Sequence, residues 1–186
     1  MNSKKKIEIE VPNGKKPEWV NGVLTLVDEK PKNVTERVKT FEDACNELGN
    51  DHQAVIDYYA LCDATCSTKD ILAYAKLSII AAALNEGWKP RFTTDEYRYF
   101  PWFRLYTQSE IDEMGEEEKK RVVYRSNSYA NAYGGVAYAS TFSDSSSTST
   151  SFGVRLAFKT RELAEYAGSQ FVEIWADYVF KLEEEK

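Results

Sequence analysis

The sequence predicts an α+β protein, a single domain over residues 1–186 in which a mainly antiparallel, twisted sheet packs against helices. Three observations predict this class. Helical patterns gather in residues 34–87, aromatic and alternating segments fill residues 88–158, and a long amphipathic stripe occupies residues 160–182. The length of 186 residues and the 42% of apolar residues suit one hydrophobic core. No stretch reaches the roughly 18 apolar residues that a membrane-spanning helix needs, so we expect no membrane contact.

The N-terminal residues 7–27 predict a strand and a hairpin that together form an arm. Apolar and charged residues alternate over residues 7–11, which predicts a strand with one apolar face. The dipeptide Asn21-Gly22 lies between two apolar pairs, a pattern that predicts a tight hairpin turn because both positions accept a positive φ.

Three helices are predicted within residues 34–87. Thr40 and Asp43 have the spacing of a capping box in front of the first helix, and a short helix follows it. The third helix begins near residues 67–68 and ends at Gly87. Because it is apolar on nearly all sides, we expect it to lie at the centre of the domain.

Strands dominate the predicted structure of residues 88–158. The predicted strands are residues 97–106, 121–125, 135–142 and 152–158. Pro101 favours an edge position or a bulge for the first of them, since proline cannot donate to a ladder. The chain closes with one long helix over residues 160–182, in which Gly168 permits close approach of another element.

Composition argues against several chemistries. The formal net charge of −6 disfavours attraction of the whole surface to nucleic acid or anionic lipid. The three cysteines are too few for a disulfide framework. The basic residues 1–6 are followed by no apolar stretch, so we expect no signal peptide and a cytoplasmic location.

Motifs for catalysis and cofactor binding are missing from the sequence. His52 is the single histidine, and its place at a polar helix start predicts a capping or solvent-facing role. We therefore expect neither enzymatic activity nor a cofactor. Cys45, His52, Cys62 and Cys66 make a nominal three-cysteine, one-histidine set, but without the short spacing of a zinc clip. A zinc site remains the weaker alternative to ordinary packing of these side chains.

An aromatic and basic segment at residues 88–106 is the most distinctive feature of the sequence. On a strand, alternate side chains face opposite sides. The set expected to face outward consists of Arg98, Phe100, Trp102, Arg104 and Tyr106. The set expected to pack inward consists of Tyr97, Tyr99, Phe103 and Leu105. Aromatic rings and guanidinium groups dominate protein interfaces, and they also bind single-stranded nucleic acid. The alternative is that a second layer covers this face and the arginines extend past it to solvent.

Residues 126–140 are rich in tyrosine, serine, asparagine and glycine, a composition that adaptable binding surfaces favour. Tyr129, Tyr133 and Tyr138 therefore extend the predicted contact surface. A sheet of small residues with ordinary exposed tyrosines is the alternative.

Three stretches point to a known family: residues 83–90 (Ala-Leu-Asn-Glu-Gly-Trp-Lys-Pro), residues 99–103 (Tyr-Phe-Pro-Trp-Phe) and residues 152–171. Through them the second half of the chain resembles an uncharacterised protein family that phages and prophages of gut Bacteroidales encode. Val154 and Ala157 stand where many of those relatives have serine and cysteine, so no thiol role transfers. The resemblance implies a phage-linked context and carries no catalytic residue.

These features together predict a non-catalytic, phage-associated binding or assembly protein that has a protein partner or self-associates. The second hypothesis is an accessory protein for single-stranded DNA in phage replication or recombination, and the third is a small metal-dependent module. The expected location is the cytoplasm of the bacterial host, or the virion if the protein is structural.

Overall fold

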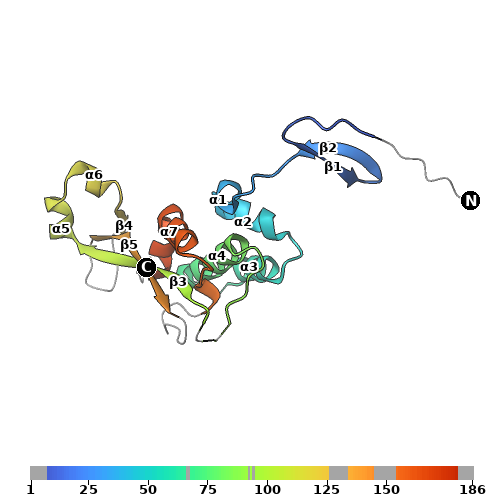
Figure 1. Cartoon of the computed structure of the whole chain (residues 1–186). Helices are drawn as coiled ribbons and strands as arrows, with labels where there is room; N and C mark the ends of the chain where they lie inside the picture. Colours follow the sequence, from blue (N-terminus) through green and yellow to red (C-terminus); the bar gives the residue numbers. More distant parts are fainter. Residues whose placement is uncertain are drawn as a thin grey trace, which may run out of the picture. The chain divides into compact units, whose positions relative to one another are not determined.

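The computed structural model describes residues 8–65, 68–91, 93, 95–125, 134–144 and 154–179. Helices combine with two small antiparallel sheets, which confirms the predicted α+β class (Figure 1). Backbone contacts divide the chain into two compact units, residues 1–33 and residues 34–186, and each is described by itself. The extent of a single domain over residues 1–186 stays a prediction.

The N-terminal unit is a β-hairpin of β1 (Lys15–Val20) and β2 (Val23–Asp28). Asn21 and Gly22 connect the strands with φ values of 50° and 79°, the positive values that a two-residue hairpin turn demands. The hairpin predicted from this dipeptide is confirmed.

The strand predicted over residues 7–11 is wrong for the part that the structure describes. Residues 8–12 carry no strand, and Ile9 and Val11 are exposed. Among the described residues, only β2 pairs with β1, so no ladder extends to this segment. Alternation alone does not make a strand without a neighbour to pair with.

The second unit begins with a helical block that surrounds one central helix. Its helices are α1 (Val34–Arg37), α2 (Phe41–Leu48), α3 (Gln53–Asp63) and α4 (Lys69–Leu84). Thr40 and Asp43 form the predicted capping box at the start of α2. Helix α4 contacts α2, α3 and the C-terminal helix α8 (Val172–Val179), which confirms its central place. It contributes Leu77, Ile80 and Leu84 to the core.

A three-stranded sheet in the order β3-β5-β4 follows the helical block. Its strands are β3 (Arg98–Thr107), β4 (Val123–Arg125) and β5 (Gly134–Asp144), with α5 (Gln108–Glu113) and α6 (Glu116–Lys119) between β3 and β4. Strand β3 is an edge strand, as Pro101 predicts. The pairing of β3 with β5 shifts between Trp102 and Phe103, which marks a bulge.

The strand predicted over residues 152–158 is wrong where the structure describes it. The backbone forms a short 3₁₀ helix, η1 (Val154–Leu156), and then a single bridge in which Tyr99 and Phe158 exchange hydrogen bonds of 3.0 and 2.9 Å. Asn85, at the end of α4, holds this segment. Its side chain donates to the Ala157 carbonyl at 2.8 Å and accepts from the Lys159 amide at 2.9 Å. Because Asn85 binds these two backbone groups, they are fixed without a strand neighbour.

The long helix predicted over residues 160–182 is divided in two, and residues 180–182 lie outside the described residues. Helix α7 (Arg161–Gln170) ends at Phe171, whose φ and ψ are −110° and 27°, and α8 follows. The break lets Trp175 turn into the core, where its indole nitrogen donates to the Ala167 carbonyl at 3.2 Å.

Helix α7 packs directly on the β3–β5 ladder (Figure 1). Gly168 lies where the two come closest. A Cβ atom at Gly168 would lie 2.5 Å from Cδ2 of Tyr138 and 2.8 Å from Cβ of Pro101. Only glycine allows this approach, as predicted from the sequence.

Candidate binding surface

The first half of β3 is buried, contrary to the prediction. Arg98 and Phe100 are 0% and 2% exposed, so the expectation that they face outward is wrong. The Arg98 guanidinium donates through Nη1 to the Arg91 carbonyl at 2.5 Å. The Glu96 carboxylate accepts from the Arg91 amide at 2.7 Å. Arg98 therefore holds the loop in front of β3 instead of reaching solvent.

The second half of β3 keeps its predicted outward set on the surface. Trp102 is 53% exposed, Arg104 is exposed, and Tyr106 is half-buried. These three residues, which we call the Trp102 row, alternate along one side of the strand. The Arg104 guanidinium carbon lies 4.9 Å from the centre of the Tyr106 ring, within the range of a cation–π contact.

Glu110 fixes the position of the Arg104 side chain. Its carboxylate accepts from Arg104 Nη2 at 3.2 Å and from the Thr107 amide and hydroxyl at 2.8 and 3.0 Å. Hydrogen bonds from the Thr107 backbone and hydroxyl, followed by that from Arg104, lower the pKa of Glu110 below its usual range. The carboxylate is thus ionised at neutral pH, and Arg104 lies between it and the Tyr106 ring.

The opposite face of β3 is covered by the C-terminal helices. The Phe103 ring lies 5.2 Å from the Trp175 ring, so Phe103 packs inward as predicted. Tyr99 is half-buried, whereas Tyr97 and Leu105 are exposed. The inward expectation is wrong for these last two: Tyr97 precedes the strand, and Leu105 lies near its end.

Tyr138 belongs to the helix–sheet contact and not to an open surface. It is half-buried, its ring lies 6.3 Å from that of Phe103, and its hydroxyl is 2.7 Å from the Thr141 hydroxyl. Its predicted place on an exposed contact surface is therefore wrong. Tyr129 and Tyr133 lie outside the described residues.

Two residues of the alternative zinc set, Cys45 and His52, have structural roles. Cys45 is buried in α2, and burial raises the pKa of its thiol. His52 caps α3, since its Nδ1 accepts from the Ala54 amide at 3.3 Å, as the sequence predicts. Cys62 is exposed, and Cys66 lies outside the described residues. Within the part of the chain that the structure describes, no three His, Cys, Asp or Glu side chains gather as a metal site.

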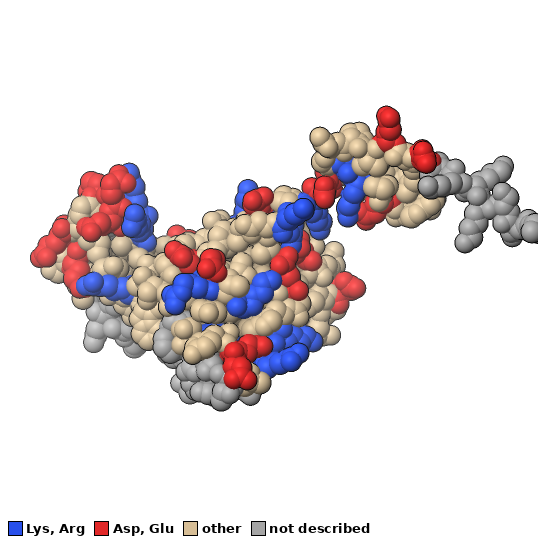
Figure 2. Space-filling view, viewed as in Figure 1, with Lys and Arg blue, Asp and Glu red and all other residues tan. Residues whose placement is uncertain are grey.

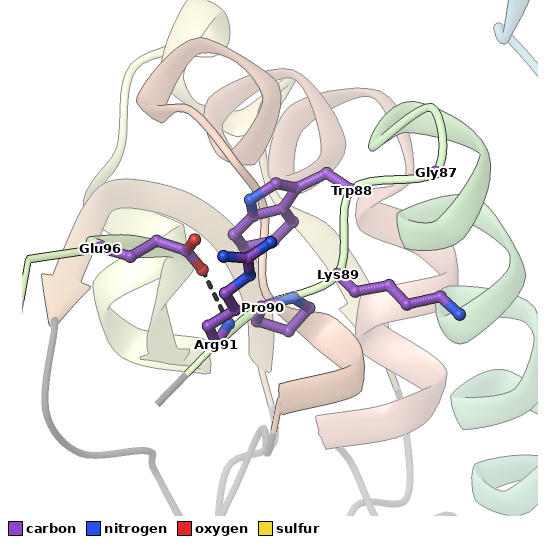
Figure 3. Close-up of a pocket in the computed structure, with 6 residues that line it drawn as sticks. All are labelled: Gly87, Trp88, Lys89, Pro90, Arg91 and Glu96. Atoms are coloured by element: carbon purple, nitrogen blue, oxygen red, sulfur yellow. Dashed lines mark hydrogen bonds between the residues drawn. The ribbon is translucent and has the colours of Figure 1, made fainter. Parts of the chain in front are cut away.

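A shallow pocket of about 480 Å³ lies in the loop between α4 and β3 (Figure 3). Its described lining is Gly87, Trp88, Lys89, Pro90, Arg91 and Glu96. Lys89 points away from Trp88 and Glu96 in Figure 3. The pocket thus offers one ring, one guanidinium group and a carboxylate that already accepts a backbone hydrogen bond. None of the described lining residues is a serine, threonine, cysteine or histidine.

Acidic side chains gather over α5 and α6, at the end of the sheet that carries Tyr106 (Figure 2). They include Glu110, Glu116, Glu117 and Glu118. A phosphate group that approaches the Trp102 row from this side meets a negative field.

The sequence-based prediction missed the exposed apolar face of the hairpin. Trp19 is 71% exposed, and Leu24 lies opposite it in the register. Pro17 and Leu26 form the next pair on the same face. Strand alternation on both sides of Asn21-Gly22 could have identified this face.

No protein-family model, curated protein or solved structure matches the chain. In the described part of the chain, no helix has both the length and the apolar character needed to cross a bilayer.

Proposed function

We propose that this chain is a non-catalytic protein that acts by binding another protein through the Trp102 row, in the phage-linked context that its resemblance implies. The observation that supports the proposal is the exposure of Trp102. Its side chain is 53% exposed in the middle of a strand whose other face is packed against helices. A large apolar ring in water with a guanidinium group beside it is typical of an interface anchor.

The Trp102 row is also held in place before any partner arrives. Arg104 is fixed between Tyr106 and Glu110, and β3 pairs with β5 on both sides of the bulge at Trp102 and Phe103. Side chains that are already ordered lose little entropy on binding. This arrangement favours recognition of a complementary protein surface.

Single-stranded DNA is the second candidate ligand. An exposed indole can stack on a base, and such stacking contributes about 1–3 kcal/mol for each base. The cations are less suited to this role, because Arg98 is buried and Arg104 is paired with Glu110. We therefore place protein binding first.

The test compares Trp102→Ala with Leu105→Ala in full-length chains. Leu105 is exposed on the same strand, but its side chain points to the opposite side. Partners recovered from the host would be identified, and the affinity of each purified partner for each chain measured by calorimetry. Trp102→Ala should cost about 2 kcal/mol or more, roughly thirtyfold in Kd, as at an interface hot spot. Leu105→Ala should change Kd by no more than about twofold.

Equal affinity of the Trp102→Ala chain and the unchanged chain would contradict the proposal. A second titration uses a fluorescent oligothymidine at low and at high salt. If the chain binds the oligothymidine in a salt-sensitive way and Trp102→Ala abolishes this binding, the ligand of the Trp102 row is single-stranded DNA and not a protein.

A further inference from the structure

The two outer edges of the N-terminal hairpin differ in their ability to accept another strand. The Glu29 amide donates to the Gly14 carbonyl at 2.8 Å, which fixes the alternation of the ladder between β1 and β2. Pairs such as Glu18–Thr25 then exchange hydrogen bonds within the hairpin, whereas Pro17–Leu26 and Trp19–Leu24 direct their backbone groups outward.

The outer edge of β1 is blocked by Pro17. Proline has no amide hydrogen, and it occupies one of the outward positions of this strand. Charged Lys16 and Glu18 flank it, and both charge and proline protect edges against pairing. A further strand cannot continue the ladder here.

The outer edge of β2 is open to pairing. Leu24 and Leu26 present outward amide and carbonyl groups, and residues 23–27 contain neither proline nor charge. Among the described residues no strand other than β1 pairs with β2. Such an edge accepts an antiparallel strand of matching side chains.

The sequence of this edge is its own mirror image. Residues 23–27 read Val-Leu-Thr-Leu-Val in both directions. We propose that β2 pairs antiparallel with β2 of a second copy of this chain, about a two-fold axis at Thr25. Thr25 then lies opposite Thr25 of the second copy, Leu24 opposite Leu26, and Val23 opposite Val27. A two-fold interface demands this kind of self-complementarity.

This pairing satisfies the backbone and the side chains in the same register. Leu24 exchanges two backbone hydrogen bonds with Leu26 of the second copy, because the amide and carbonyl groups of both residues are directed toward the outer edge of the hairpin. Thr25 meets its counterpart at a non-hydrogen-bonded position, where threonine pairs are favourable. Asp28 falls opposite Gly22 of the second copy, so no like charges meet.

The proposed pairing also explains how an exposed hairpin is stabilised. An isolated two-stranded hairpin is marginally stable in water, and three or more strands with an apolar face are needed for independent stability. The second copy doubles the strands and joins the two faces of Pro17, Trp19, Leu24 and Leu26 into one. Because Pro17 blocks the other edge, the assembly closes as a dimer and does not extend into a filament.

Register-specific disulfide formation tests the proposal in the full chain. The background carries Cys45→Ala, Cys62→Ser and Cys66→Ser, which removes the natural thiols. Thr25→Cys should form a covalent dimer on mild oxidation, because residues at a two-fold non-hydrogen-bonded pair lie within disulfide distance. Val23→Cys alone should form it at least about tenfold more slowly, since it faces Val27 and not itself. A mixture of Val23→Cys and Val27→Cys chains should restore rapid formation.

The second measurement is the mass of the unmodified chain by sedimentation equilibrium. Leu26→Pro removes an outward amide but leaves the internal ladder intact, as Pro17 opposite it already does on β1. It should raise the dimer dissociation constant at least about tenfold. A monomer at all concentrations, or equal rates of disulfide formation at positions 25 and 23, would overturn the proposal.

Discussion

The β1–β2 hairpin and the β3–β5 ladder are both antiparallel pairs with an aromatic face, but only one of them is covered. Phe103 of β3 packs against Trp175, which is 1% exposed, whereas Trp19 of β1 is 71% exposed. Both pairs have alternating side chains, but a tight turn joins only β1 to β2, while α5, α6 and β4 lie between β3 and β5 in the chain. Burial of the aromatic face requires a second layer, and α7 and α8 supply it for β3 and β5.

This difference shows what an exposed apolar face means in this chain. In the second unit (residues 34–186), which we call the body, α7 lies so close to the sheet that a Cβ atom at Gly168 would overlap Pro101 and Tyr138. For Trp19, the described residues supply no comparable cover. An apolar face that remains exposed in this way indicates an interaction with another molecule.

The largest expected effect is the difference in stability between alanine substitutions of Trp175, in the body, and Trp19, in the hairpin. Trp175→Ala should lower the free energy of unfolding by about 3–5 kcal/mol, because it leaves a cavity in the core and removes the hydrogen bond to the Ala167 carbonyl. Trp19→Ala should change it by no more than about 0.5 kcal/mol. Urea denaturation of both variants, followed by circular dichroism, measures the difference. Equal losses would mean that the hairpin belongs to the same cooperative core.

Two glycine substitutions sharpen the comparison at a smaller scale. Gly168→Ala should destabilise the body by about 1–3 kcal/mol, because the added Cβ overlaps Pro101 and Tyr138. At an exposed helical position the same change would stabilise the helix by about 1 kcal/mol, so the sign of the effect reports the contact. Ser169→Ala, on the exposed side of α7, is the matched control.

Gly22→Ala makes the same substitution as Gly168→Ala at a glycine that has no close neighbour. A Cβ at Gly22 meets nothing within 4 Å, but its φ of 79° is strained for alanine. The protection of the hairpin amides against hydrogen exchange should fall, while the urea midpoint for unfolding of the body should stay unchanged. A shifted midpoint would contradict the separation of the two units.

Local rules predicted most of the fold from the sequence. The capping box at Thr40, the Asn21-Gly22 turn and the close approach at Gly168 each depend on a few neighbouring residues. The wrong predictions concern features that depend on packing between residues far apart in the sequence. The break at Phe171 depends on where Trp175 finds space in the core, and periodicity in a sequence does not contain that information.

The candidate surface was predicted in part for the same reason. Alternation identified the side of β3 that carries Trp102 and Arg104, but not the loop that covers Arg98. In that loop Arg91 accepts from Arg98 and donates to Glu96, and no repeat in the sequence predicts where these two residues lie. The palindrome of residues 23–27, by contrast, was readable in the sequence, but its meaning required the register that Asn21-Gly22 sets.

The smallest expected effect concerns charge. In the hairpin, Lys15 and Asp28 form an exposed ion pair of 2.5 Å, while in the body Glu86 accepts from Lys159 at 2.9 Å and from Arg37 at 2.8 Å. Hydrogen bonds from Lys159 and then Arg37 lower the pKa of Glu86 below its ordinary 4.5. The network therefore stabilises the body fully above about pH 5, and this contribution is lost as the pH falls below 4.5.

Glu86→Gln should accordingly destabilise the body at pH 7, and its stability should converge with that of the unchanged chain as the pH falls below the lowered pKa of Glu86. The difference at pH 7 should stay below about 1 kcal/mol, because the Glu86 side chain is 41% exposed and solvent screens it. Asp28→Asn, the control in the hairpin, should leave urea midpoints of the body unchanged over the same pH range. If the difference in free energy of unfolding between Glu86→Gln and the unchanged chain stays constant from pH 7 to pH 3, the destabilisation comes from packing and not from ionisation. Charge would then not be among the forces that distinguish the body from the hairpin.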